Sequence, residues 1–148
     1  WFNERIMRLF GKVAHPHERY RVNSSTWYTS ALALLALFAP LPAAEIAVIV
    51  LAFADPAAAL VGRRHGRTRL RAGRSLEGTL AFFAVGTLVS LAVLFAFHPL
   101  AFPAMLALAA AGGVSGALAE LFSTSLDDNF TIPVCAGFAA WGTSLLLL

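Results

Sequence analysis

The stretch that decides the fold is Ala54-Asp55-Pro56-Ala57-Ala58-Ala59-Leu60-Val61-Gly62-Arg63-Arg64-His65-Gly66. It carries an aspartate inside hydrophobic sequence, and it opens a run of six arginines that ends at Arg74. An acidic side chain inside a membrane is energetically costly, so such a residue is treated first as a functional one. Together with the arginines and glycines beside it, Asp55 predicts a site for a polyphosphate at a membrane surface.

The composition indicates an integral membrane protein. The chain has 148 residues, of which 59% are hydrophobic and 13% charged, and the hydrophobic residues occur in long blocks. This length allows a single domain, residues 1–148. The basic residues fall in short segments between the blocks, which is typical of cytoplasmic loops and argues against nucleic acid as a partner. The single cysteine, Cys135, and the spacing of the four histidines predict neither a disulfide framework nor a zinc site.

Five apolar runs predict a bundle of about five transmembrane helices, at residues 26–39, 43–61, 78–97, 103–122 and 130–148. The last four are about 19 to 20 residues long and can span a bilayer, whereas the first is short, at about 21 Å as a helix. Residues 1–22 place apolar side chains on one helical face, which predicts an amphipathic helix lying in the membrane interface. Because the chain starts at Trp1, we expect that a segment is missing upstream.

Alternation of the helices gathers the charged loops on one side of the membrane. Residues 15–25, 62–77 and 123–129 share one face, and residues 40–42 and 98–102 share the other. The first group carries nearly all the charge outside the opening helix, so the positive-inside rule assigns it to the cytoplasm. Five acids gather there with the arginines: Asp55, Glu77, Glu120, Asp127 and Asp128.

Asp55 precedes a proline, and this pair predicts a local break in the helix. Pro56 disfavours the α conformation at Asp55 and leaves the carbonyl of Ala52 without its usual partner. A carboxylate beside a free carbonyl near the interface favours a cation or hydroxyl site. The alternative is a structural aspartate paired with Arg63 or Arg64.

Glycines and arginines follow each other in a pattern that suits phosphate. Glycines let the backbone approach an anion, and arginines bind phosphate through two parallel hydrogen bonds. Ser75 is predicted to cap the helix that begins there, whose positive dipole end would face the same site. The alternative is that the arginines only fix the topology or bind anionic lipid.

Asp127-Asp128-Asn129 stands before the last helix and allows two interpretations. Asp and Asn cap helix N-termini well, and carboxylates together with substrate phosphates also suit Mg²⁺. Gly112 and Gly116 predict close packing of their helix. Glu120 lies on the same helical face and is expected to point into the bundle.

Three motifs resemble the CTP-dependent lipid kinases, the family of dolichol kinase, phytol kinase and the fungal-type diacylglycerol kinase. The motifs run from Asp55 to Gly66, from Gly73 to Thr79 and from Asp127 to Pro133, and the likeness covers nearly the whole chain. Two departures are Ala54, where the family often has Gly, and Arg74, where it often has Lys. The basic and histidine motif of the family's first helix has no counterpart here, which agrees with a missing N-terminal segment.

The resemblance implies a lipid-alcohol kinase that transfers the γ-phosphoryl group of CTP to a dolichol or other polyprenol, a phytol or a diacylglycerol at the cytoplasmic face. It implies that Asp55 and Glu77 are catalytic and that Mg²⁺ is held by Asp127, Asp128 and Glu120. The residues implied for the CTP phosphates are Gly62, Arg63, Arg64, Gly66, Arg67, Gly73, Arg74 and Ser75. The lipid alcohol and the oligomeric state stay open.

Two other functions remain as alternatives. Phosphatidate cytidylyltransferase shares part of the pattern, but it then carries Lys-Asp and Asp-Arg-x-Asp segments, and residues 121–133 here contain no lysine or arginine. A transporter or non-enzymatic subunit could line an anion path with acids and arginines. The clustering of charge on one face and the apolar outer half of the bundle disfavour such a path.

Overall fold

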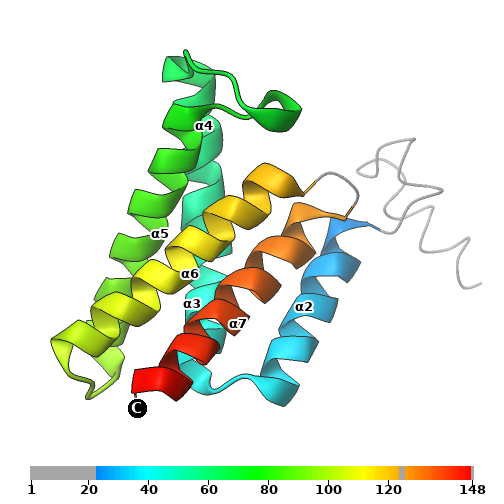
Figure 1. Ribbon diagram of the computed structural model, residues 1–148. Coiled ribbons are helices and arrows are strands. Elements are labelled where there is room, and N and C mark those ends of the chain that lie inside the picture. Colours follow the sequence, from blue (N-terminus) through cyan, green and yellow to red (C-terminus); the bar gives the residue numbers. More distant parts are fainter. Residues whose placement is uncertain (1–22, 124–125, 148) are drawn as a thin grey trace, which may run out of the picture.

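The computed structural model describes residues 23–123 and 126–147, and the predicted interfacial helix at residues 1–22 lies outside this part. The described chain is helical, with one isolated bridge between Arg69 and Ser75. Its elements are α2 (Ser24–Phe38), α3 (Leu41–Ile49), the π-helical turn η2 (Val50–Ala54), α4 (Asp55–His65), the 3₁₀ turn η3 (Arg71–Gly73), α5 (Leu76–Phe97), α6 (Phe102–Phe122) and α7 (Asp128–Leu147) (Figure 1).

In the described part of the chain, four helices are long and apolar enough to cross a membrane. α3, η2 and α4 continue into one another as a single helix of 25 residues, Leu41–His65, and α5, α6 and α7 have 22, 21 and 20 residues. α2 has 15 residues and falls short of that length, as its apolar run predicted. The prediction of an all-helical membrane bundle is therefore confirmed.

The irregularity near Pro56 lies ahead of Asp55 and not at it. Asp55 has helical dihedral angles, φ −63° and ψ −49°, so the prediction that it leaves the α conformation is wrong. The π-helical turn η2 precedes it and contains Ala52, whose carbonyl the proline ring would meet in a regular α-helix. The wider π turn relieves this contact and lets the helix continue to His65. Residues 62–65 are consequently helical and do not belong to the predicted loop.

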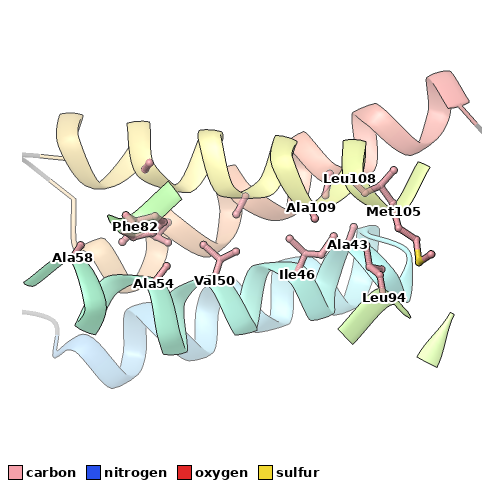
Figure 2. Close-up of a cluster of buried hydrophobic side chains, with 14 residues drawn as sticks. Ala43, Ile46, Val50, Ala54, Ala58, Phe82, Leu94, Met105, Leu108 and Ala109 are labelled. Carbon is pink, nitrogen blue, oxygen red and sulfur yellow. The ribbon is translucent and has the colours of Figure 1, made fainter. Parts of the chain in front are cut away.

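Small residues let the helices of the bundle pack closely, as predicted for Gly112 and Gly116. A Cβ added at Gly116 would lie 2.9 Å from both Phe82 Cε1 and Val50 Cγ1, so the side chains of α5 and η2 fill the space beside α6. Figure 2 shows this core, in which side chains of the α3–α4 helix face those of α6. The close approach fixes the position of Glu120, one turn further along α6.

A substitution at Gly112 tests this packing. An added Cβ would lie 2.4 Å from Cγ2 of Ile46, a stiff β-branched side chain that is 1% exposed. We therefore expect Gly112→Ala to lower the stability by about 1–3 kcal/mol through overpacking, seen as a lower midpoint of thermal unfolding in detergent. Gly142→Ala is the matched control, because nothing lies within 4 Å of its added Cβ. Equal midpoints for the two variants would contradict the packing.

A polar contact joins two helices at each end of the bundle. At one end Ser24 Oγ donates to Asp127 Oδ2 over 3.0 Å and joins α2 to the start of α7. At the other end Glu45 and His98 form a pair over 2.6 Å, which joins α3 to the end of α5. Five helix ends and the loop between α4 and α5 meet at the first end, and this end holds the candidate site (Figure 1).

Candidate functional site

A pocket of about 310 Å³ opens between α4, the following loop and the start of α5, with α6 on one side. Its lining combines small residues, three arginines and one buried carboxylate. The lining residues are Ala58, Ala59, Gly62, Arg63, Arg69, Gly73, Arg74, Ser75, Gly78, Thr79 and Glu120. The three arginines and the small residues are the kind of lining that binds phosphate groups, and the carboxylate of Glu120 lies beside them.

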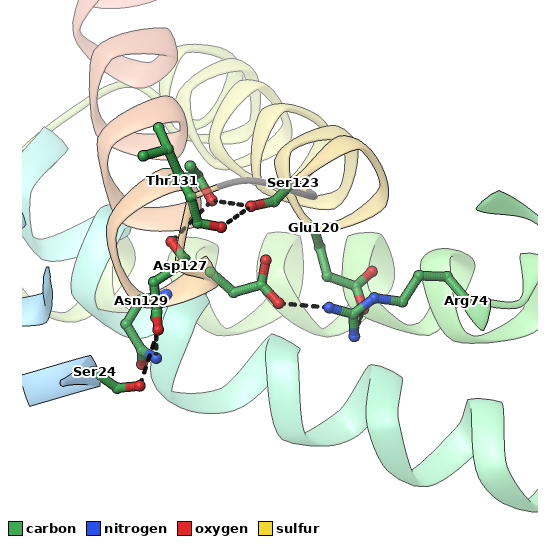
Figure 3. A network of polar contacts seen from close by, with 9 residues as sticks. Ser24, Arg74, Glu120, Ser123, Asp127, Asn129 and Thr131 are labelled. Atoms are coloured by element: carbon green, nitrogen blue, oxygen red, sulfur yellow. Dashed lines mark hydrogen bonds and ion pairs between the residues drawn. The ribbon is translucent and has the colours of Figure 1, made fainter. Parts of the chain in front are cut away.

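Arg74 is held between two carboxylates on different helices. Its Nη1 lies 2.9 Å from Oε1 of Glu120 on α6, and its Nη2 lies 2.5 Å from Oδ2 of Asp128 at the start of α7 (Figure 3). The side chain of Glu120 is 3% exposed, which confirms that it points into the bundle. Asp55 lies within electrostatic range of Arg74, Asp128 and Glu120. Two carboxylates therefore bond one guanidinium beside the pocket, and a third lies in the same neighbourhood.

Ser75 caps α5, as predicted, and it is enclosed by glycines. Its Oγ accepts a hydrogen bond from the backbone nitrogen of Gly78 over 3.1 Å, and the residue is 3% exposed. A Cβ on Gly62, Gly66 or Gly78 would lie 3.1, 2.8 or 3.2 Å from this oxygen. These glycines are therefore needed for the close approach of α4 to α5, which places the first turn of α5 and its dipole at the pocket.

Only some of the predicted arginines reach the pocket. Arg63 and Arg74 line it, whereas Arg64 and Arg67 do not, although Arg63, Arg64 and Arg67 are all exposed. Successive residues of an α-helix point about 100° apart, which explains why Arg63 lines the pocket and its neighbour Arg64 does not. Of the predicted glycines, Gly62 and Gly73 line the pocket and Gly66 does not.

Sequence reasoning missed five lining residues: Ala58, Ala59, Arg69, Gly78 and Thr79. Ala58 precedes Gly62 by four residues and Thr79 follows Ser75 by four, so helical spacing could have placed both on the pocket face. Arg69 had no such signal. It reaches the pocket because the loop folds back on itself, through the hydrogen bonds Leu70 N to Arg74 O and Leu76 N to Thr68 O.

Glu77 supports this loop. Its Oε1 accepts a hydrogen bond from the backbone nitrogen of Thr68 over 3.2 Å, and the side chain does not line the pocket. The loop turns at Ala72 and Gly73, which have positive φ values of 53° and 79°. Gly73 suits this conformation because it has no Cβ, and its backbone forms part of the pocket wall.

Asp127 caps α7 and points away from Glu120. Its Oδ1 accepts hydrogen bonds from the backbone and side-chain nitrogens of Asn129, over 2.9 and 2.7 Å, and its Oδ2 accepts one from Ser24. Burial raises the pKa of Asp127, but these hydrogen bonds together lower it by more, so its pKa lies below the ordinary value. Asp127 therefore acts as the helix cap that the first interpretation of this motif predicted, while Asp128 forms an ion pair with Arg74.

The predicted Mg²⁺ ligands are thus divided between two networks. Across residues 23–123 and 126–147, no three His, Cys, Asp or Glu side chains lie close enough to hold a metal by themselves. Glu120 Oε2 is nevertheless buried without a hydrogen-bond partner in the same part of the chain. Because Mg²⁺ commonly binds one or two carboxylates together with substrate phosphates, Glu120 and Asp128 fit such a site. Asp127, in its present orientation, does not.

Comparisons with known proteins point to one group of enzymes. The chain is 30% identical over 155 residues to CTP-dependent diacylglycerol kinase 1 of Eremothecium gossypii, which covers 90% of this chain and 48% of that protein. It is 38% identical over 110 residues to the phytol kinase of Synechocystis sp., covering 71% of this chain and 46% of that protein. CTP-dependent diacylglycerol kinase 1 of Saccharomyces cerevisiae is 30% identical over 159 residues, which covers 90% and 53%.

The chain therefore spans about half the length of the curated relatives it matches. No family model and no solved structure matches it.

Proposed function

The chain belongs to the family of the CTP-dependent diacylglycerol kinases and phytol kinases, and on this premise we propose that it transfers the γ-phosphoryl group of CTP to a lipid alcohol. The observation that carries the proposal is the pocket lined by Arg63, Arg69 and Arg74 at one end of a membrane bundle. A pocket at one end of the bundle suits an acceptor whose hydroxyl lies at the headgroup level of a bilayer. Phosphoryl transfer depends mainly on positioning and on neutralising charge, which such a site provides.

Each lining group has a role in holding the triphosphate. Arg63 and Arg69 line the pocket and would bind phosphate oxygens through charge-assisted hydrogen bonds. The first turn of α5, with Ser75, Gly78 and Thr79 in the lining, adds the positive end of its dipole. Gly73 lets the backbone approach the phosphates because no side chain stands in the way.

Carboxylates complete the site beside Arg74. Asp55 is the group we assign to the acceptor hydroxyl, where it takes up the proton as the oxygen attacks phosphorus. Glu120 and Asp128 would hold Mg²⁺, which supplies positive charge to the triphosphate. Glu77 keeps the loop between α4 and α5 in place through Thr68, and this loop carries Arg69 and Arg74.

The acceptor is a long-chain alcohol that reaches the site from the bilayer. Two relatives act on diacylglycerol and one on phytol, by their names, and these two alcohols are the first candidates, with dolichol or another polyprenol as the third. The charge of the loops supports a site on the cytoplasmic face. Exposed leucine and phenylalanine side chains on the helices form the lipid-facing surface.

Labelled CTP tests the reaction directly. The purified protein in detergent with Mg²⁺ is given diacylglycerol, phytol, a polyprenol or phosphatidate, in parallel with γ-labelled and α-labelled CTP. We expect label in the lipid from γ-labelled CTP alone, and the accepting alcohol identifies the substrate. Label from α-labelled CTP would establish nucleotidyl transfer in its place. Absence of label from both, with a folded protein, would contradict the proposal.

A further inference from the structure

Arg74 occupies the position that a cation would need. Its guanidinium bridges Glu120 and Asp128, the two carboxylates that fit a divalent ion, and it also lines the pocket proposed for the triphosphate. One side chain therefore belongs to two binding sites that must be filled together. Two of its nitrogens bond carboxylates, and these ion pairs hold the guanidinium against Glu120 and Asp128 and leave fewer of its five N–H donors for phosphate (Figure 3).

The charges beside Arg74 do not balance. Glu120 and Asp128 share the single guanidinium of Arg74, so the pair carries one negative charge more than its partner when both are ionised. Glu120 is 3% exposed, and its Oε2 has no hydrogen-bond partner within the described chain. A buried carboxylate oxygen without a partner is costly, and a cation at this place would remove that cost.

We propose that Arg74 is an exchangeable partner of this cluster and links the binding of CTP to the binding of a divalent cation. Without ligands, Arg74 neutralises Glu120 and Asp128. With both ligands, the cation takes over these carboxylates, and Arg74 turns to the phosphates. The proposal rests on the proposed function, since it takes the lining of the pocket as the triphosphate site.

Neither half of this exchange is favourable alone. A cation that binds by itself must displace a guanidinium from two ion pairs and leave it without a partner. A triphosphate that binds Arg74 by itself leaves Glu120 and Asp128 as uncompensated charges. Each ligand therefore raises the affinity for the other, and thermodynamic linkage makes the two factors equal. Arg74 can move because its side chain is 29% exposed and adjoins the pocket.

The test measures Mn²⁺ binding by electron paramagnetic resonance without nucleotide, on the purified protein in detergent. In Arg74→Gln the carboxylates lose their competing partner, and we expect Mn²⁺ to bind tighter than in the wild type by roughly 5- to 150-fold, the usual range of such couplings. Arg71→Gln is the matched control, because Arg71 lies over the ring of Phe122, 5.9 Å from its centroid, and not in the pocket. Unchanged affinity in Arg74→Gln, or an equal gain in Arg71→Gln, would overturn the proposal.

Two further measurements keep the test decisive. Adding Glu120→Gln to Arg74→Gln is expected to cancel the gain, and a gain that persists would place the ion elsewhere and overturn the proposal. If Arg74→Gln does not fold, the wild-type protein is tested with CTP. The Mn²⁺ affinity of the protein with CTP must then exceed the Mn²⁺ affinity of free CTP in solution. These titrations need no turnover. If γ-label is transferred to the lipid but the Mn²⁺ effect is absent, the proposed kinase activity is kept and only the proposed exchange of Arg74 is contradicted.

Discussion

Asp55→Asn is expected to lower kcat by about 10²- to 10⁴-fold, the usual contribution of a general base, with little change in KM for CTP. The carboxylate lies on α4, directly after the π-helical turn, within electrostatic range of Arg74, Glu120 and Asp128. It does not line the pocket assigned to the triphosphate, so its loss should affect the acceptor hydroxyl and not CTP binding. Initial rates with varied CTP at saturating acceptor separate the two parameters.

The fold should survive this change. Within residues 23–123 and 126–147, the Asp55 carboxylate makes no hydrogen bond or ion pair, so asparagine leaves no partner unpaired there. We expect the thermal unfolding midpoint of the variant to equal or exceed that of the wild type. Glu45→Gln is the control, because it removes an acid from the opposite end of the bundle, where Glu45 pairs with His98. Full activity of Asp55→Asn would remove Asp55 from the mechanism.

The sequence predicted those features that depend on local composition. Long apolar runs predict membrane helices, because every buried backbone group in a bilayer must be satisfied within the helix. Ser75 is recognisable as a cap because a hydroxyl residue stands directly before such a run. The burial of Glu120 follows from its place on the helical face that carries Gly112 and Gly116, which must pack closely.

Features that depend on tertiary contacts were not predictable in this way. Asp127 and Asp128 are neighbours with the same side chain, yet one caps α7 and the other binds Arg74, which lies 54 residues away in the chain. Arg69 enters the pocket only because the loop folds back against Ser75. The π-helical turn was missed because sequence shows that Pro56 disturbs a helix but not which preceding residues absorb the disturbance.

Arg63→Gln is expected to reduce kcat/KM for CTP by about 10- to 150-fold, which corresponds to the loss of one charge-assisted hydrogen bond. Arg63 lies in the last turn of α4 and lines the pocket, so glutamine there removes a positive charge directed at the triphosphate. Arg64 follows it in the same turn and is exposed outside the pocket. Arg64→Gln removes the same charge from nearly the same position along the helix axis and is expected to keep kcat/KM close to the wild-type value.

The pair of variants distinguishes a binding site from a general positive field. If the arginines act only by attracting anions to the membrane surface, both variants should lose activity alike, and the loss should shrink as salt screens the field. If the pocket binds the triphosphate, only Arg63→Gln should lose activity, and the loss should persist at high salt because the contact is direct. Equal effects at both positions would contradict the pocket as the CTP site. A selective effect at Arg63 would mean that helical geometry, and not the number of arginines, decides which cations contact the nucleotide.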